Sequence, residues 1–164
     1  MPYQNAKPQT VEWETPPELF ERLNRLYGFD LDVCASDSNA KCARYFTAAD
    51  DGLAQAWHGT CWMNPPYGRP LAQWMQKAES ERRRCRVIVC LVPARTDTKW
   101  FHEYVHGKAE IYFIRGRIRF LREGLPMQGA NFPSMIVVYR AHDSSATFSF
   151  EKGHKSLSLT VVPE

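Results

Sequence analysis

Apolar residues recur every three or four positions in three segments, which is the spacing of one helix face. The first helix is expected to begin at Thr15-Pro16-Pro17-Glu18, with Thr15 as N-cap, and to end at Gly28. A second is expected from Pro70 to the basic residues 82–84, and a third ending at Gly107. Their apolar faces consist of Leu19, Phe20, Leu23, Leu26 and Tyr27, then Leu71, Trp74, Met75 and Ala78, and finally Trp100, Phe101, Tyr104 and Val105.

Shorter apolar runs predict strands at residues 29–33, 44–47, 60–63, 87–92, 109–114, 117–121 and 134–140. The run at 87–92 is continuous, which is typical of a strand buried on both faces of a parallel sheet. A weak alternation of Leu157, Leu159 and Val161 indicates one further strand. Because strands and helices alternate, we expect an α/β fold, with an open mixed sheet and helices on both of its faces.

The chain of 164 residues has the length of a single domain, expected to span residues 1–164 with residues 1–12 loosely ordered. No segment is large enough for a separate target-recognition domain, so site selection is expected from loops at 95–107 and 121–133. Two polar segments, Cys34-Ala35-Ser36 and Asn64-Pro65-Pro66-Tyr67, follow predicted strands. Ligands of open α/β sheets bind beyond the carboxyl ends of strands, so these segments are expected to share one crevice.

Composition narrows the class of protein only slightly. The net charge of +3 permits a nucleic-acid partner without requiring one. The chain shows no signal peptide and no apolar stretch near membrane-spanning length, which predicts a cytoplasmic protein. Its five cysteines include no Cys-x-x-Cys pair and are interpreted as reduced thiols. Since no zinc spacing occurs either, no metal is expected.

The tetrad Asn64-Pro65-Pro66-Tyr67 suits the methylation of a planar exocyclic amine. Such a nitrogen is a poor nucleophile because its lone pair is delocalised into the ring. The Asn64 side-chain oxygen and a carbonyl of the Pro65-Pro66 segment can each accept one N–H of the amine, and the prolines fix the direction of that carbonyl. The Tyr67 ring can stack on the heterocycle.

The tetrad also has a purely structural interpretation, since Asn-Pro and Pro-Pro are ordinary turn formers and Tyr67 could simply pack on the surface. Four residues alone leave both interpretations open. The chemistry leaves the acceptor open as well, because adenine in DNA, adenine in RNA and a glutamine amide all present a planar NH₂ group.

Further motifs occur in order along the chain: Trp13-Glu14-Thr15-Pro16-Pro17, Asp32-Val33-Cys34-Ala35-Ser36, Asp51-Gly52-Leu53, the tetrad with Gly68, Leu91 to His102, Gly116 to Phe120, and Asn131-Phe132-Pro133-Ser134. Over roughly residues 11–140 this series resembles the phage-type DNA N6-adenine methyltransferases, the phage Dam-like family, and the series is far more specific than any single motif. The resemblance implies a Rossmann-like fold, S-adenosylmethionine as methyl donor, and adenine in DNA as methyl acceptor. It also implies that the protein is encoded by a phage or prophage.

The resemblance also suggests which residues bind the cofactor. Trp13, Thr15 and Pro16 match the family's segment near the methionine end of the cofactor, where the Thr15 hydroxyl could meet a carboxylate or serve only as an N-cap. The cofactor turn of methyltransferases is usually glycine-rich. Here that position holds Asp32, Cys34 and Ala35, and Asp32 could accept from the donor's ammonium group or be a solvated turn residue.

Asp50 and Asp51 follow at a spacing that suits an acid binding the ribose hydroxyls or the adenine amino group of the cofactor. The sequence does not separate the two roles, and for Asp50 a simple Asp-Asp-Gly turn is nearly as good an interpretation.

Four arginines are expected to bind DNA. Arg95 lies in one of the family-like motifs, and Arg115, Arg117 and Arg119 alternate, so on a strand they would share one face. Three guanidinium groups on one face repel each other unless an anion such as a phosphate backbone meets them. Salt bridges to Glu110 or Glu123 are the structural alternative.

Together these observations predict a DNA N6-adenine methyltransferase. Asn64 and the Pro65 carbonyl would orient the amine of an adenine that leaves the duplex stack. RNA adenine or protein glutamine remain alternative acceptors. A non-catalytic nucleic-acid-binding relative is a further alternative, favoured by the missing glycines at Cys34-Ala35-Ser36 and opposed by the intact tetrad.

Overall fold

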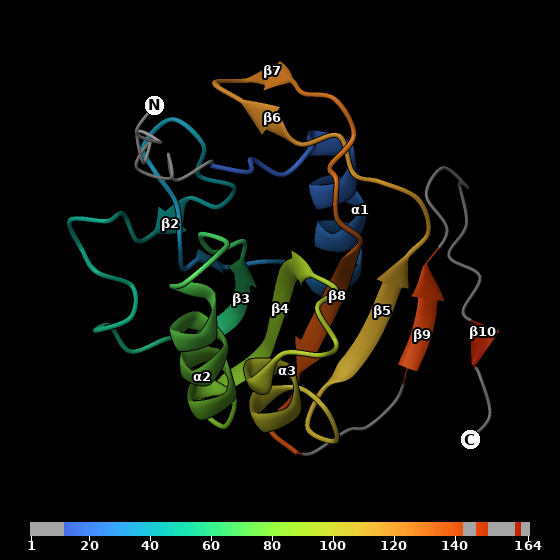
Figure 1. The fold of residues 1–164 in the computed structure, drawn as a ribbon. Coiled ribbons are helices and arrows are strands. Elements are labelled where there is room, and N and C mark those ends of the chain that lie inside the picture. The colour runs from blue at the N-terminus through green and yellow to red at the C-terminus, as the bar shows by residue number, and fades with distance from the viewer. Residues whose placement is uncertain (1–11, 143–146, 151–159, 162–164) are drawn as a thin grey trace, which may run out of the picture.

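The computed structural model describes residues 12–142, 147–150 and 160–161. Within them one sheet has the strand order β10-β9-β5-β8-β4-β3-β1-β2, and a small hairpin pairs β6 with β7 (Figure 1). The strands are β1 Leu31–Asp32, β2 Arg44–Tyr45, β3 Gly59–Met63, β4 Cys85–Pro93, β5 Glu110–Ile114, β6 Leu121–Arg122, β7 Leu125–Pro126, β8 Ser134–Tyr139, β9 Thr147–Phe150 and β10 Thr160–Val161.

The sheet is parallel where the predicted crevice lies. Strands β2, β1, β3 and β4 run parallel, whereas β8 is antiparallel to both β4 and β5. The chain leaves β1 toward the edge strand β2 and then returns to β3 on the other side of β1. This reversal is a topological switch point, where open α/β sheets bind their ligands.

Helices cover both faces of the sheet. Helix α1 (Pro17–Tyr27) packs Phe20 and Leu23 against one face, and α2 (Leu71–Glu81) and α3 (Lys99–Tyr104) cover the other (Figure 1). The central strands are buried on both faces: every residue of β8 is buried, as are Val87 to Pro93 of β4. Each fully buried Val or Leu side chain stabilises such a fold by about 1.5–3 kcal/mol. The α/β prediction with helices on both faces is therefore confirmed.

Two details of the first helix differ from the prediction. Pro16 rather than Thr15 is the N-cap residue, and no side chain caps the helix; the Pro16 carbonyl accepts from the N–H groups of Leu19 and Phe20. Thr15 is drawn away because its hydroxyl bonds to Asn64 instead. Leu26, assigned to the apolar face, is 53% exposed, whereas Phe20 and Leu23 of the same face are buried.

The predicted strand at 117–121 is wrong except at Leu121. Residues 117–120 bury Ile118 and Phe120 against the α1 side of the core, which explains the alternating pattern. Their backbone pairs with no strand among the described residues. The carbonyls of Phe120 and Ile118 instead accept hydrogen bonds from the N–H groups of Met127 and Ala130, which lie in the same connection between β5 and β8. Alternating apolar residues therefore indicate that one side of an extended segment is buried, whether or not the segment pairs as a strand.

Some expectations fall near the chain ends. Val161 lies in β10, as the weak alternation indicated, while Leu157 and Leu159 lie outside the described residues, as do residues 1–11. Strand β9 was not predicted. Among the helices of the described part of the chain, none has the length and apolar character needed to cross a membrane.

Candidate active site

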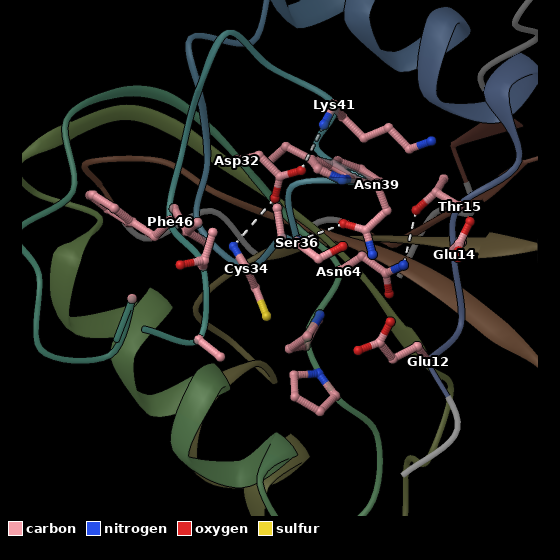
Figure 2. A pocket seen from close by; sticks show the side chains of 18 of the residues that line it. Glu12, Glu14, Thr15, Asp32, Cys34, Ser36, Asn39, Lys41, Phe46 and Asn64 are labelled. Atoms are coloured by element: carbon pink, nitrogen blue, oxygen red, sulfur yellow. Dashed lines mark hydrogen bonds between the residues drawn. The ribbon is translucent and has the colours of Figure 1, made fainter. Parts of the chain in front are cut away.

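A cavity of about 430 Å³ opens at the carboxyl ends of β1 and β3, within the size range of small-molecule sites. Five parts of the chain line it: residues 12–15, the loop after β1, residues 46–52, the end of β3 with the following residues, and Trp74 of α2 (Figure 2). The predicted site residues among its walls are Trp13, Thr15, Asp32, Cys34, Ala35, Asp51, Asn64, Pro65 and Pro66. The two predicted polar segments therefore do share one crevice.

Asn64 reaches into this cavity with an incompletely bonded amide. Its Nδ2 donates to the backbone oxygen of Trp13 and, over 3.0 Å, to the Thr15 hydroxyl. Its Oδ1 is buried and has no hydrogen-bond partner. Leaving a buried acceptor unpaired costs about 1–3 kcal/mol, so such an atom calls for an explanation. A ligand N–H group would complete it.

Tyr67 lies outside the cavity wall, in an aromatic cluster with Trp13, Phe120 and Phe132. The rings of Tyr67 and Trp13 are stacked, with centroids 6.5 Å apart, and both phenylalanines meet Tyr67 edge-on. The Tyr67 hydroxyl donates to the Leu91 carbonyl over 3.1 Å, and burial raises the pKa of this phenol well above its ordinary value. Through this cluster the tetrad packs against Trp13 near the N-terminus and against Phe120 and Phe132 in the connection between β5 and β8.

Asp32 organises the other strand end. Its two carboxylate oxygens accept from the backbone N–H groups of Cys34 (3.3 Å) and Lys41 (3.0 Å), as Figure 2 shows. Asp32 is 2% exposed, and this desolvation raises its pKa to about 6 against the opposing effect of the two bonds. The Asp32 carboxylate thus stabilises the loop after β1 by hydrogen bonds to its backbone. These bonds account for a loop that contains Cys34-Ala35-Ser36 at the position where other methyltransferases usually have glycines.

Cys34 contributes a neutral wall rather than a nucleophile. Burial, with smaller contributions from Asp32 and Glu12, raises the pKa of its thiol to about 12. A thiol in that state is inert and packs as a small apolar group.

The neighbours Asp50 and Asp51 take different positions. The exposed Asp50 carboxylate accepts from the Thr47 N–H and hydroxyl, both at 2.8 Å, and these bonds lower its pKa. Asp51 lines the cavity and has a positive φ of 54°. A side chain at Gly52 would place its Cβ 2.2 Å from the Val33 carbonyl oxygen. Asp50 thus stabilises the turn by its bonds to Thr47. Gly52 lets the turn lie close to the Val33 carbonyl, and Asp51 is the residue of the Asp50-Asp51 pair that lines the cavity.

The four predicted DNA-binding arginines lie away from the cavity. Arg95 follows β4, and Arg115, Arg117 and Arg119 follow β5; all are exposed. Strands β4 and β5 both run antiparallel to β8, and β4 runs parallel to β3. The carboxyl ends of β4 and β5 therefore lie on the same side of the sheet as the end of β3, where the cavity opens. The prediction of a strand at Arg115, Arg117 and Arg119 is wrong, and all four arginines lie beyond strands that end on the same side of the sheet as the cavity.

Sequence reasoning missed several lining residues. Glu12 and Glu14 join Asp32 and Asp51, while Lys41 is the one basic side chain among the lining residues of the described chain. The walls are therefore net negative and favour a cation. Glu14 also pairs by its backbone with Leu121, and its carboxylate accepts from the N–H groups of Glu123 and Gly124 in the β6–β7 turn. No local motif signals either role.

Two of the predicted cofactor-binding residues do not line the cavity. Pro16 is the N-cap of α1, and Asp50 holds its turn. Among the described residues, no three His, Cys, Asp or Glu side chains are grouped so as to hold a metal ion.

Comparisons with known proteins identify the family of this chain. A DNA N-6-adenine-methyltransferase of Haemophilus phage HP1 is 32% identical over 133 residues, covering 77% of each chain. One of Escherichia phage T1 is 31% identical over 148 residues, covering 78% of this chain and 62% of its own. A solved structure, described as a predicted O-methyltransferase of Agrobacterium tumefaciens, shares 18% identity with a TM-score of 0.34, over 88% of this chain and 71% of its own. The family model for DNA N-6-adenine-methyltransferase (Dam) matches residues 4–159, and the chain belongs to this family.

Proposed function

We propose that this protein transfers a methyl group from S-adenosylmethionine to the N6 amine of adenine in DNA. The observation that carries the proposal is the buried, unpaired Oδ1 of Asn64, which lies beside two prolines at the end of β3 and at the wall of a cofactor-sized cavity. Family membership supports the same chemistry.

The residues around the cavity fit S-adenosylmethionine. The donor carries a sulfonium and an ammonium group, and the lining holds four carboxylates against one lysine. Asp32 is suited to the ammonium group, and Asp51 to the ribose hydroxyls or the adenine amino group. Trp13, Cys34 and Ala35 supply walls, and the absence of a side chain at Gly52 keeps the turn close to β1. When bound, the cofactor supplies an electrophilic methyl group.

The tetrad would act on the acceptor. Asn64 Oδ1 and the Pro65 carbonyl each accept one N–H of the adenine amine, which directs the nitrogen lone pair toward the donor. Tyr67 stacks on the base. The rate enhancement comes from this positioning and from carbonyl dipoles that favour the positive charge forming on nitrogen.

The target adenine must leave the duplex to reach this site, because its amine is engaged inside the stack. Arg95, Arg115, Arg117 and Arg119, which are exposed and follow β4 and β5, would bind the phosphates around the extruded base.

The test is to incubate the protein with methyl-labelled S-adenosylmethionine and a mixture of DNA, RNA and protein, and then to identify the modified unit. The proposal expects N6-methyladenine in DNA, formed far more slowly by Asn64→Ala as matched control. Label confined to RNA adenine or to glutamine would assign a different acceptor, and cofactor binding without any transfer would indicate a non-catalytic relative.

A further inference from the structure

An asparagine that must present an acceptor faces a problem of orientation. The side-chain amide can rotate by half a turn and exchange its oxygen and its NH₂ group with little change of shape. In the wrong orientation, the NH₂ group would face the N–H groups of the target amine and repel them. A site that depends on Asn64 Oδ1 therefore needs neighbours that select one orientation.

The neighbours of Asn64 do so. The Trp13 carbonyl can only accept, so it bonds with the NH₂ group and would repel the oxygen. The Trp13 carbonyl thereby selects the orientation. The Thr15 hydroxyl can donate or accept, and by accepting the second hydrogen at 3.0 Å it stabilises the amide in the orientation that the carbonyl imposes; Thr15 is 1% exposed. With both amide hydrogens engaged, Oδ1 remains as the unpaired atom. Figure 2 shows Thr15 and Asn64 facing each other across this bond.

We propose that Thr15 is a positioning residue for methyl transfer, whose hydroxyl, together with the Trp13 carbonyl, holds the Asn64 amide with its oxygen toward the target amine. The inference rests on the proposed function and deepens it. It is distinct from a cofactor-binding role for Thr15, since here the hydroxyl accepts from Asn64, whereas a cofactor-binding role would use the hydroxyl hydrogen. Thr15 acts through Asn64 and does not itself touch the reacting atoms.

The experiment compares Thr15→Val, which keeps the shape without the hydroxyl, with Thr15→Ser, which keeps the hydroxyl. At saturating cofactor and DNA, Thr15→Val should lower the single-turnover rate by about 10- to 100-fold, the scale of a misplaced catalytic group. Thr15→Ser should retain most of the rate. The cofactor Kd, measured by calorimetry, should stay at the wild-type value in both.

A double variant gives a readout that a structural role would not move. Because Thr15 acts through Asn64, Thr15→Val combined with Asn64→Ala should be no slower than Asn64→Ala alone. Melting temperatures check that each variant is folded. Should Thr15→Val not fold, Thr15→Ala removes the same hydroxyl with less bulk and carries the same expectations.

Three results would overturn the inference while leaving the proposed function intact. These are a wild-type rate in Thr15→Val, additive losses in the double variant, or a weakened cofactor Kd with a normal saturated rate. The last would make Thr15 a cofactor ligand. Failure of the wild-type protein to form N6-methyladenine in DNA would instead overturn the proposed function, and this role with it.

Discussion

The two strand ends that border the cavity use their polar side chains differently. At the end of β1, both carboxylate oxygens of Asp32 accept backbone N–H groups and hold a loop. At the end of β3, Asn64 engages both amide hydrogens and leaves its oxygen without a partner. The β1 end is bonded to its own chain, whereas the β3 end holds an acceptor available for a substrate. In the proposed function, the first end binds the cofactor and the second end carries out the chemistry.

The largest expected effect comes from breaking the β3 end. Asn64→Ala removes one of two acceptors for the target amine and should lower turnover on the order of 10²-fold or more. Folding and cofactor affinity should change little, because within the described part of the chain the amide bonds only to Trp13 and Thr15. Single-turnover methylation of adenine-containing DNA measures the loss, and near-normal turnover would remove Asn64 from the mechanism.

Two substitutions of Tyr67, which follows β3 as well, separate the role of its ring from that of its hydroxyl. Tyr67→Ala should lose roughly 1–3 kcal/mol of base engagement, if the ring stacks on the extruded base. Tyr67→Phe should keep most activity and lose about 1 kcal/mol of stability, because the Leu91 carbonyl loses its donor. DNA affinity and thermal melts of both variants distinguish the effects. Equal loss of activity in Phe and Ala would show that the hydroxyl, rather than stacking, matters.

Sequence reasoning succeeded where the signal is local. The tetrad, the helix at 71–81 and the buried strand β4 each follow from a contiguous pattern. The bond between Thr15 and Asn64 could not be predicted, because it joins residues 49 positions apart through the fold.

Two neighbouring patterns show the same limit. Asp50 and Asp51 are chemically identical neighbours, and only the turn geometry sends Asp51 to the cavity. The arginine segment alternates as a strand would, yet its regular burial arises from packing of Ile118 and Phe120 without a partner strand.

At the β1 end, pH should reveal the role of Asp32. Burial raises the pKa of Asp32 to about 6, so its protonated form favours the fold at low pH and this contribution is lost as pH rises through about 6. A cation bound beside Asp32 favours the ionised form instead. Cofactor affinity should therefore increase by about tenfold from pH 5 to pH 7.

Calorimetry at several pH values measures this dependence. In Asp32→Asn the affinity should be weaker and nearly flat with pH. A wild-type affinity that does not change with pH would separate Asp32 from the ammonium group.

The smallest effect concerns the arginines outside the cavity. Arg119→Gln should lower the slope of log K against log salt for DNA binding by about one unit and weaken all sequences alike, as expected for one lost phosphate contact. Titrations on specific and random duplexes at several salt concentrations measure the slope. A relaxed preference at one base, with the slope intact, would assign base recognition, and a lower melting temperature alone would assign a structural role.

The most direct test of the contrast measures cofactor Kd and saturated methylation rate on the same preparations of Asn64→Ala and Asp32→Asn. The account predicts that Asn64→Ala binds S-adenosylmethionine normally and loses rate on the order of 10²-fold. It predicts that Asp32→Asn loses more in cofactor affinity than in saturated rate. The reverse assignment, with Asn64→Ala weak in cofactor binding and normal in rate at saturation, would contradict it.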